Sequence, residues 1–278
     1  MNTDIIIRDL VPEDAFELSA LFRRCYGETY GSPIFYDEKA LVELINNREL
    51  ISAVATKGQQ ILGHVGITVR HQGSEVCETG NTVVDPKERG QGLLLRLGAA
   101  LHELVQRNGY VGYLHYPTTA HEIMQRASVA YGGKETGVML AYVPETTDTK
   151  LEVKQTGRLA ATVAYQPLLP TSSREVILPE RYRAVIASIY KKLNLDRRVT
   201  TPLPSLDLSL VSDETQLIEN YNPQRGLLHI FVATECGHIA SKVSALIKKY
   251  QPKIVHIDLP LDNPEIDVVI ESLRKLGF

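Results

Sequence analysis

The apolar positions in the first half of the chain repeat with two different periods. Beyond Gly92 they recur every three or four residues, which predicts a helix with one buried face. The apolar positions of this helix are Leu93, Leu94, Leu97, Ala100, Leu101, Leu104 and Val105. Helical patterns also cover residues 15–26 and 37–45. Three β-rich runs lie between them and the long helix, separated by short turns that contain glycine, and such turns predict antiparallel hairpins. The runs span residues 50–56, 61–71 and 75–84.

The remaining elements of this half complete an alternating order. A β-rich run at residues 4–8 precedes the first helix. The elements after the long helix are a strand, a helix and a strand, at residues 110–116, 120–131 and 137–143. The predicted order is therefore β-α-α-β-β-β-α-β-α-β. A polar, aperiodic stretch at 144–149 is typical of a linker. We therefore predict a first domain over residues 1–145 and a second over residues 146–278.

The second half has a less regular start. Its first predicted elements are a strand, a helix and a strand, at residues 159–165, 180–193 and 206–211. A regular strand–helix–strand–helix alternation comes next, at residues 227–233, 239–250, 253–259 and 265–276. The same order of elements occurs in the first half from its fourth strand onwards. We therefore predict that the second half is a degenerate copy of the first unit.

Composition and charge exclude several classes of protein. The 278 residues, 44% hydrophobic and 23% charged, are typical of a soluble globular protein with one large or two ordinary domains. A net charge of −3 argues against nucleic acid as the main partner. No apolar run approaches the ~18 residues of a membrane span, and the N-terminus shows no export signal. We expect no membrane partner and a cytoplasmic location.

The number and spacing of the cysteines agree with a cytoplasmic location. Cys25, Cys77 and Cys236 are too few and too scattered for a disulfide framework or a zinc cluster. No stretch resembles a metal-ligand pair, so we expect no metal. The assembly state is open, with a homodimer as one option.

The stretch from Thr82 to Leu94 predicts a strand, a proline-led turn, a glycine-containing loop and then the long helix. Backbone N–H groups at a helix start have no intrahelical acceptor, and the helix dipole is positive there. Glycines let a phosphate approach those donors, so the stretch favours anion binding. The Gly-Lys-Ser/Thr of a nucleotide P-loop and the three-glycine dinucleotide fingerprint are both absent. An ordinary strand–loop–helix corner with two glycines is the alternative.

The hexapeptide Arg89-Gly90-Gln91-Gly92-Leu93-Leu94 resembles the signature of the GNAT N-acetyltransferase superfamily, Arg/Gln-x-x-Gly-x-Gly/Ala. Leu94 departs from its last, small position. The element order is also that of the GNAT fold, with the signature between the fourth strand and the third helix. The resemblance implies an α/β (α+β) fold with a mixed, mainly antiparallel central sheet flanked by helices. It also implies that the chain consists of two tandem GNAT-like units, of which the second is degenerate.

The resemblance also implies where acyl-CoA binds. The fourth and fifth strands would splay apart, and the pantetheine arm would pair with the edge of the fourth strand at Val83 and Val84. The pyrophosphate would lie on the backbone N–H groups of Arg89, Gly90, Gln91, Gly92, Leu93 and Leu94. The charge of Arg89 would add to this binding.

Acyl transfer to an amine needs a base for the attacking nitrogen and an acid for the leaving thiolate. Glu78 lies eleven residues before Arg89, similar to the catalytic glutamate of the histone-acetylating branch. Strand alternation predicts that Glu78, Gly80, Thr82 and Val84 share one face, and partial burial would raise the pKa of Glu78 towards that of a base. The alternative is an ordinary carboxylate on a half-exposed strand.

The acid is less well defined by the sequence. The family often has a tyrosine on the fourth helix, four residues before a Gly-Phe pair, and Ser128 stands at that position. Tyr131 is three residues further on, and His115 and His121 lie near the end of the fifth strand. His121, at the start of the predicted helix, is the most suggestive of these. The alternative for His121 is a surface or capping residue.

The second half lacks the features that would bind CoA. The loop that corresponds to the signature, Thr234–His238, has no Arg-x-x-Gly, and Glu235 would place negative charge at the helix start. Cys236 there is either a small buried residue or a thiol with a lowered pKa. The chain stops at Phe278, where such a unit would continue into its closing strand. We expect this strand to be missing or replaced by another pairing.

The resemblance implies an acyl-CoA-dependent N-acyltransferase, most specifically an acetyl-CoA-dependent N-acetyltransferase, whose first half is catalytic and whose second half is not. A small-molecule or peptide amine would attack the thioester directly, with no covalent enzyme intermediate. One alternative is a non-catalytic acyl-CoA-binding or regulatory module on the same fold. A purely structural partner protein is another.

Overall fold

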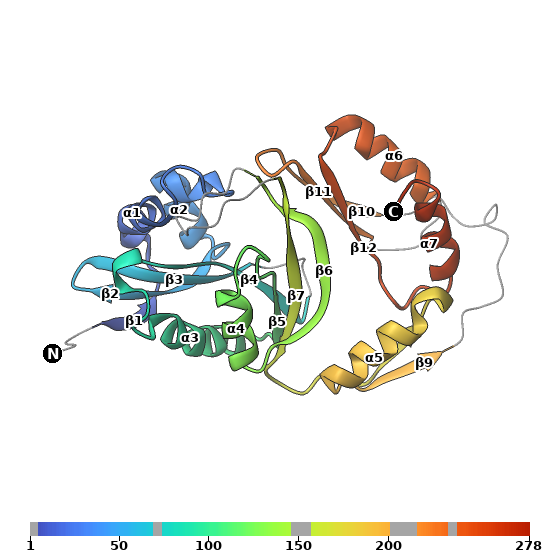
Figure 1. The fold of residues 1–278 in the computed structure, drawn as a ribbon, viewed down its shortest axis with the longest axis horizontal. Helices are drawn as coiled ribbons and strands as arrows, with labels where there is room; N and C mark the ends of the chain where they lie inside the picture. Colours follow the sequence, from blue (N-terminus) through green and yellow to red (C-terminus); the bar gives the residue numbers. More distant parts are fainter. Residues whose placement is uncertain (1–4, 69–73, 146–156, 201–215, 233–237) are drawn as a thin grey trace. The chain divides into compact units, whose positions relative to one another are not determined.

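A computed structural model describes residues 5–68, 74–145, 157–200, 216–232 and 238–278 (Figure 1). The chain divides into two compact units, Met1–Pro170 and Thr171–Phe278. The sequence placed this division after residue 145. The structure places it later, because the strand after the predicted linker returns to the sheet of the first unit.

The first unit is built on one seven-stranded sheet in the order β1-β2-β3-β4-β5-β7-β6. Its strands are β1 (Ile6–Asp9), β2 (Ile51–Lys57), β3 (Gln60–Thr68), β4 (Val76–Val84), β5 (Gly112–His115), β6 (Lys134–Val143) and β7 (Leu159–Pro167). Only β4 and β5 run parallel; the other neighbouring pairs are antiparallel. This confirms the predicted mixed, mainly antiparallel sheet flanked by helices.

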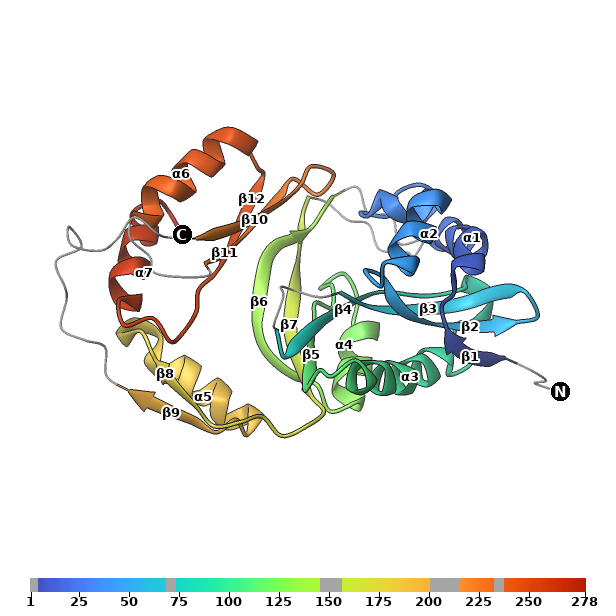
Figure 2. The ribbon, with the colours of Figure 1, turned by 180° about the vertical axis from the view of Figure 1, so that it is seen from behind.

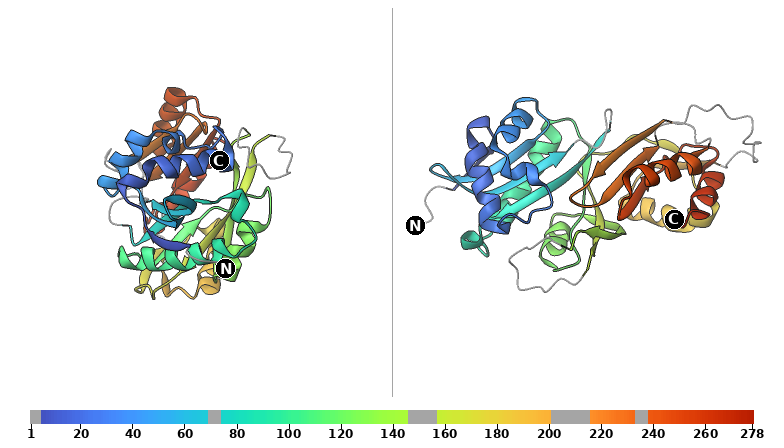
Figure 3. Two further views of the ribbon diagram at one scale, coloured as in Figure 1. Left: turned by 90° about the vertical axis from the view of Figure 1, so that its left-hand side faces the viewer. Right: turned by 90° about the horizontal axis from the view of Figure 1, so that it is seen from above.

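Helices cover both faces of this sheet. They are α1 (Ala15–Tyr26), α2 (Glu38–Asn46), α3 (Leu93–Arg107) and α4 (Ile123–Ala130), with the short 3-10 turns η1 (Pro12–Asp14), η2 (Pro33–Tyr36) and η3 (Pro86–Glu88). Figure 2 shows α1 and α2 on one side of the sheet and α3 on the other, and the two views of Figure 3 agree. The periodicity of the sequence predicted all four helices.

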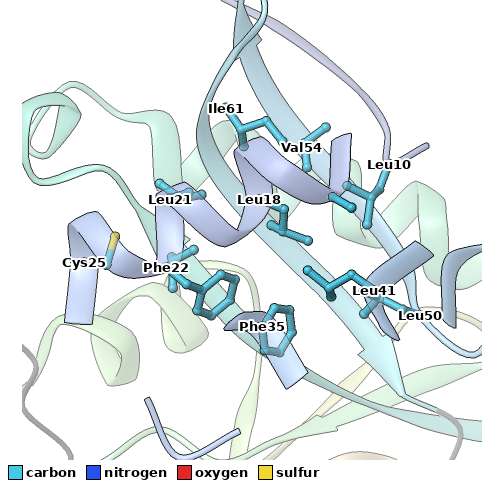
Figure 4. Packing of buried hydrophobic residues seen from close by; sticks show 12 residues of the cluster. Leu10, Leu18, Leu21, Phe22, Cys25, Phe35, Leu41, Leu50, Val54 and Ile61 are labelled. Atoms are coloured by element: carbon cyan, nitrogen blue, oxygen red, sulfur yellow. The ribbon is translucent and has the colours of Figure 1, made fainter. Parts of the chain in front are cut away.

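Two hydrophobic cores fill the space between helices and sheet. The α1–α2 core contains Leu10, Ala15, Leu18, Leu21, Phe22, Cys25, Phe35, Leu41, Leu50, Val54, Ile61 and Val83 (Figure 4). The α3 core contains Ala53, Ala55, Leu62, Val65, Ile67, Cys77, Leu93, Leu97, Leu101, Leu104, Val105 and Tyr113. Each fully buried Leu or Phe side chain contributes roughly 1.5–3 kcal/mol, so these clusters hold the helices on the sheet.

Strand β4 carries one residue more than β3 at its centre. Gly80 pairs with Gly66 and Val83 pairs with His64, so two residues of β4 lie opposite one residue of β3. Asn81, the first of the two, has a left-handed φ of 55°. An extra residue with disrupted pairing is a β-bulge, which bends the strand and increases its local twist.

The bulge makes one sequence prediction wrong. Alternation placed Glu78, Gly80, Thr82 and Val84 on a single face. In the structure Val83 packs in the α1–α2 core, whereas Val84 packs against the α3 core together with Cys77. Glu78 and Gly80 therefore share a face with Val83 and not with Val84, because the extra residue shifts the alternation by one position.

The described residues of the second unit form two small sheets. Strands β8 (Arg174–Ile177) and β9 (Arg197–Thr200) are parallel, and β10 (Leu217–Asn222), β11 (Leu227–Val232) and β12 (Ile254–Asp258) form a sheet in that order. Its helices are α5 (Arg183–Leu193), α6 (Ile239–Tyr250) and α7 (Ile266–Arg274), with the 3-10 turn η4 (Glu180–Tyr182). Helices α6 and α7 pack on the three-stranded sheet through buried residues of β11 and of both helices, among them Leu228, Ile230, Val243 and Val269, and partly buried residues of β10 and β12 pack against this cluster.

The three-stranded sheet repeats a pattern of the first unit. Strand β10 is antiparallel to β11, which is parallel to β12 across α6. The same relation joins β3, β4 and β5 across α3. A degenerate GNAT-like second unit stays a prediction. The strand expected at residues 206–211 and the residues Glu235 and Cys236 lie outside the described residues.

In the described part of the chain, no helix combines the length and the apolar character needed to cross a membrane.

Candidate active site

The glycine loop leads from β4 into α3 in an open conformation. Gly90 and Gly92 have left-handed φ angles of 77° and 76°, and Gly92 caps α3. Among the described residues, apart from the chain neighbours, no atom lies within 4 Å of the position that a Cβ would take at either glycine. The Gly92 carbonyl accepts the N–H groups of Leu95 (3.1 Å) and Arg96 (3.2 Å). The preceding N–H groups, of Leu93 and Leu94, thus lie at the positive end of the helix without an acceptor in its turns.

A buried ion pair fixes the start of this loop. The residue Asp85 is 3% exposed, and its carboxylate accepts the Arg24 Nε–H at 2.6 Å and the Lys87 backbone N–H at 3.0 Å. Arg24 also donates to the Ile61 carbonyl at 2.6 Å. Helix α1, strand β3 and the 3-10 turn before the glycines are therefore held together at one point.

The two parallel strands separate halfway along β4. The β4–β5 ladder has three pairs and ends at Glu78 and Leu114, whereas β4 continues to Val84. The Val84 carbonyl accepts the Arg89 Nε–H at 3.3 Å and the Cys25 thiol at 3.5 Å. The guanidinium of Arg89 thus lies against the strand edge that was predicted to bind pantetheine.

These features fit a CoA thioester. The open loop and the helix start offer main-chain donors to a diphosphate. The end of β4 offers backbone groups that β5 does not use. The half-buried Leu94 sits one position inside α3 and does not close the loop.

Glu78 lies at the last β4–β5 pair, where the strands begin to separate. Its side chain is half-buried on the face that carries α1 and α2, since its neighbour Cys77 is in the α3 core. The structure therefore places the predicted base beside the strand opening.

Ser128 and His115 meet on the opposite face of the sheet. Ser128 Oγ lies 2.7 Å from His115 Nε2, and Ser128 is 4% exposed. Burial lowers the pKa of His115 to about 4, so the ring is neutral at physiological pH. The residue that departs from the family pattern is thus hydrogen-bonded to a histidine from the end of β5.

Tyr131, the third candidate for the acid, packs against α3. Its ring lies against Gly98 and its hydroxyl donates to the Leu95 carbonyl, both on α3. Burial raises the pKa of Tyr131. The structure therefore does not bring this candidate acid together with Glu78.

His121 precedes α4 and interacts electrostatically with the glycine loop. Burial lowers the pKa of His121, and the positive charge of Arg89 lowers it further. Its buried Nδ1 makes no hydrogen bond to any described residue. His121 and Arg89 therefore lie close enough to interact from the β5 side and the β4 side of the opening.

Sequence reasoning missed His64, at the centre of β3. Its ring is fully buried against Phe22 and Phe35, and its Nδ1 lies 2.7 Å from the Asn81 carbonyl. A histidine within an apolar strand was the only signal in the sequence. Among the described residues, no group of three or more His, Cys, Asp or Glu side chains is placed to hold a metal ion.

The model of the family described as the acetyltransferase (GNAT) family matches residues 15–126. The chain therefore contains a GNAT acetyltransferase domain. The matched stretch runs from α1 into α4 and includes the glycine loop. The match confirms the family predicted for the first half.

Two solved structures show the same fold. An acetyltransferase of the GNAT family from Streptococcus pneumoniae is 16% identical, with a TM-score of 0.50 over 59% of this chain and 99% of that one. A Salmonella typhimurium protein, solved with acetyl-CoA as its cofactor, is 14% identical, with a TM-score of 0.50 over 62% of this chain and 98% of that one. No curated protein matches the chain.

Proposed function

We propose that the first unit is an acetyl-CoA-dependent N-acetyltransferase, which transfers the acetyl group to a small-molecule or peptide amine by direct attack. The observation that carries this proposal is the open glycine loop at the start of α3, beside the part of β4 that β5 leaves unpaired. The family match supports it, and so does the acetyl-CoA held by the Salmonella typhimurium neighbour.

The chain's own groups would hold the CoA portion. Backbone N–H groups of residues 89–94 would bind the diphosphate, and the β4 edge at Val83 and Val84 would pair with the amides of the pantetheine arm. Because Arg89 now donates to the Val84 carbonyl, its guanidinium would have to leave that carbonyl when an amide pairs there. The released charge would then be free to approach the diphosphate. Acetyl-CoA would supply an activated thioester with a good leaving group.

The candidate acid and base approach from opposite faces of the sheet. Glu78, on the α1–α2 face, would take the proton from the attacking amine. On the α3–α4 face the Ser128 hydroxyl, with His115 as its hydrogen-bond partner, would donate a hydrogen bond to the leaving thiolate, which would then take its proton from water. His121 is a further candidate at the same strand ends. This division keeps the two proton transfers apart.

The alternative is a non-catalytic module that binds acyl-CoA. Ser128 in place of a tyrosine and Leu94 in place of a small residue are the observations that favour it.

Two measurements on the full chain distinguish these functions. Calorimetry measures CoA binding, and a thiol reagent measures CoA release from acetyl-CoA with a panel of amines. We expect binding, and thiol release that depends on at least one amine. Binding without release on any amine would favour the non-catalytic module, and no binding would contradict both.

A further inference from the structure

Two buried polar atoms on the α1–α2 face have no hydrogen-bond partner among the described residues. They are Ser52 Oγ on β2 and His64 Nε2 on β3. Ser52 is 3% exposed and His64 is 0% exposed. Buried polar groups in native proteins almost always have a partner, so each of these two atoms has the capacity to form a hydrogen bond with a bound group.

The hydrogen bond at His64 Nδ1 determines which kind of ligand group His64 Nε2 can bind. Its Nδ1 lies 2.7 Å from the Asn81 carbonyl, which can only accept. Nδ1 therefore carries the proton. Burial lowers the pKa of His64 to about 4, so the ring is neutral and Nε2 holds a lone pair. This atom needs a donor, whereas the Ser52 hydroxyl can both donate and accept.

The two atoms border a strip of the sheet that carries no side chains. Gly66 pairs with Ser52 on one side and with Gly80 on the other, so these three residues form one row on this face. A Cβ at Gly66 would lie 2.8 Å from Ser52 Oγ and 3.3 Å from His64 Cε1. A Cβ at Gly80 would meet no atom of the described residues within 4 Å, its chain neighbours aside. The two unpaired atoms therefore lie close against Gly66, and open space begins at Gly80, the next residue of this row on β4.

The open end of the strip lies beside the candidate base. Glu78 is two residues before Gly80 on the same face of β4, a separation of about 7 Å along a strand. A small molecule with its amine near Glu78 would reach the unpaired atoms across the two glycines.

We propose that this strip binds the acceptor, and that a hydroxyl group of the acceptor donates to His64 Nε2 and accepts the hydroxyl proton of Ser52. The proposal rests on the acetyltransferase function proposed above. It assigns the acceptor to the class of small amines that carry a hydroxyl group.

Other ligand groups fit the two atoms less well. A carboxylate has no proton to give to Nε2. An ammonium group would bring an uncompensated charge next to Phe22 and Phe35, which is unfavourable in a buried apolar site. A water molecule has the right chemistry and is therefore the outcome that the test must separate from a ligand.

The first test compares pairs of amines that differ only at the distal group. Unbranched ω-amino alcohols with two to six carbons are measured against alkylamines in which a methyl group replaces the hydroxyl. We expect kcat/KM to favour the best amino alcohol about fivefold to tenfold. Ser52→Ala should remove most of this preference and leave kcat/KM for the alkylamine unchanged. An equal loss for both amines, or no preference in the original chain, would overturn the proposal.

The second test blocks the strip without disturbing the fold. Gly80→Val puts a side chain into the open space, at a residue without left-handed φ and in a strand that favours β-branched residues. We expect at least a tenfold higher KM for amino alcohols and unchanged CoA affinity. Gly137→Val on β6 is the matched control, because a Cβ there also meets nothing within 4 Å, and its KM should not change. Equal KM values for both variants would contradict the proposal.

A readout independent of turnover completes the design. The ¹⁵N resonance of His64 Nε2 should move when amino alcohols are added to the CoA-bound chain, and should not move with alkylamines. Absence of any shift would mean that only water occupies the strip and would overturn the proposal. A chain that binds no CoA in calorimetry would instead contradict the proposed function, so the two failures are distinguishable.

Discussion

Replacing Asp85 by asparagine tests how the start of the CoA loop is held. The Asp85 side chain is 4% exposed and its Arg24 partner 30% exposed, and Arg24 Nε lies 2.6 Å from the carboxylate. Removing one partner of a fully buried ion pair costs about 3–5 kcal/mol. Because Arg24 is partly open to solvent, which screens its charge, we expect Asp85→Asn to lower the free energy of unfolding by about 2–3 kcal/mol.

A second ion pair of similar length provides the control. Arg107 Nη2 lies 2.7 Å from Asp9 Oδ1, but the two side chains are 58% and 60% exposed. Exposed pairs contribute about 0.2–1 kcal/mol, so Asp9→Asn should change stability by less than about 1 kcal/mol. The two ion pairs therefore differ in the burial of their side chains but hardly in their N–O distance.

The assay is urea denaturation followed by far-UV circular dichroism, because the chain has no tryptophan. A double-mutant cycle with Arg24→Gln separates the pair interaction from other effects of each substitution. CoA affinity should fall together with stability in Asp85→Asn, since Asp85 also accepts the Lys87 N–H ahead of the glycines. Equal losses of stability for Asp85→Asn and Asp9→Asn would show that burial does not strengthen the Asp85–Arg24 pair.

Three further predictions concern other parts of the first unit. Gly63→Ala should lower the unfolding free energy by about 1–3 kcal/mol, because its Cβ would lie 2.7 Å from Leu97 Cδ1; unchanged urea denaturation would show that α3 can move away. Ser128→Ala should lower kcat by at least tenfold with an unchanged Kd for CoA; an unchanged kcat would remove the His115–Ser128 pair from the reaction. Burial lowers the pKa values of His64 and His115 to about 4 in the folded chain. Their contribution to stability is therefore complete above pH ~6.5 and is lost as pH falls towards 4, on the order of 3 kcal/mol for each. A His64→Leu variant should lose less stability than the original chain over this interval, and an identical pH profile would contradict the assignment.

Local patterns predicted the elements of the first unit well. The three- and four-residue spacing after Gly92 gave α3, whose buried residues Leu93, Leu97, Leu101, Leu104 and Val105 all belong to the predicted face. The glycine loop was predicted for the same reason, since left-handed glycines before an amphipathic helix form a local motif. Both features depend on residues close together in the chain.

Features that depend on distant residues were predicted less well. Alternation failed at the end of β4 because the pairing with β3 inserts a bulge at Asn81. The division between the units was placed too early because β7 pairs with β5 and β6, a partnership that no local pattern encodes.

Contacts between side chains could not be predicted either, because they also depend on residues that are distant in the chain. Ser128 looked like a lost tyrosine in the sequence, and its contact with His115 depends on how α4 packs on the sheet. The roles of Glu78, His121 and Tyr131 stay predictions. Of these three, Tyr131 is the one that the structure anchors on α3.

Calorimetry of CoA binding to Gly92→Glu, with Gly109→Glu as its control, tests whether the glycine loop at the start of α3 binds CoA. Both glycines have left-handed φ and open space at the Cβ position, so the backbone strain is similar, but Gly109 lies just past the far end of α3. We expect a carboxylate at residue 92 to abolish CoA binding in a folded protein, and the same change at residue 109 to leave the Kd within about twofold. CoA affinity that is unchanged in folded Gly92→Glu would contradict the binding of CoA at this loop.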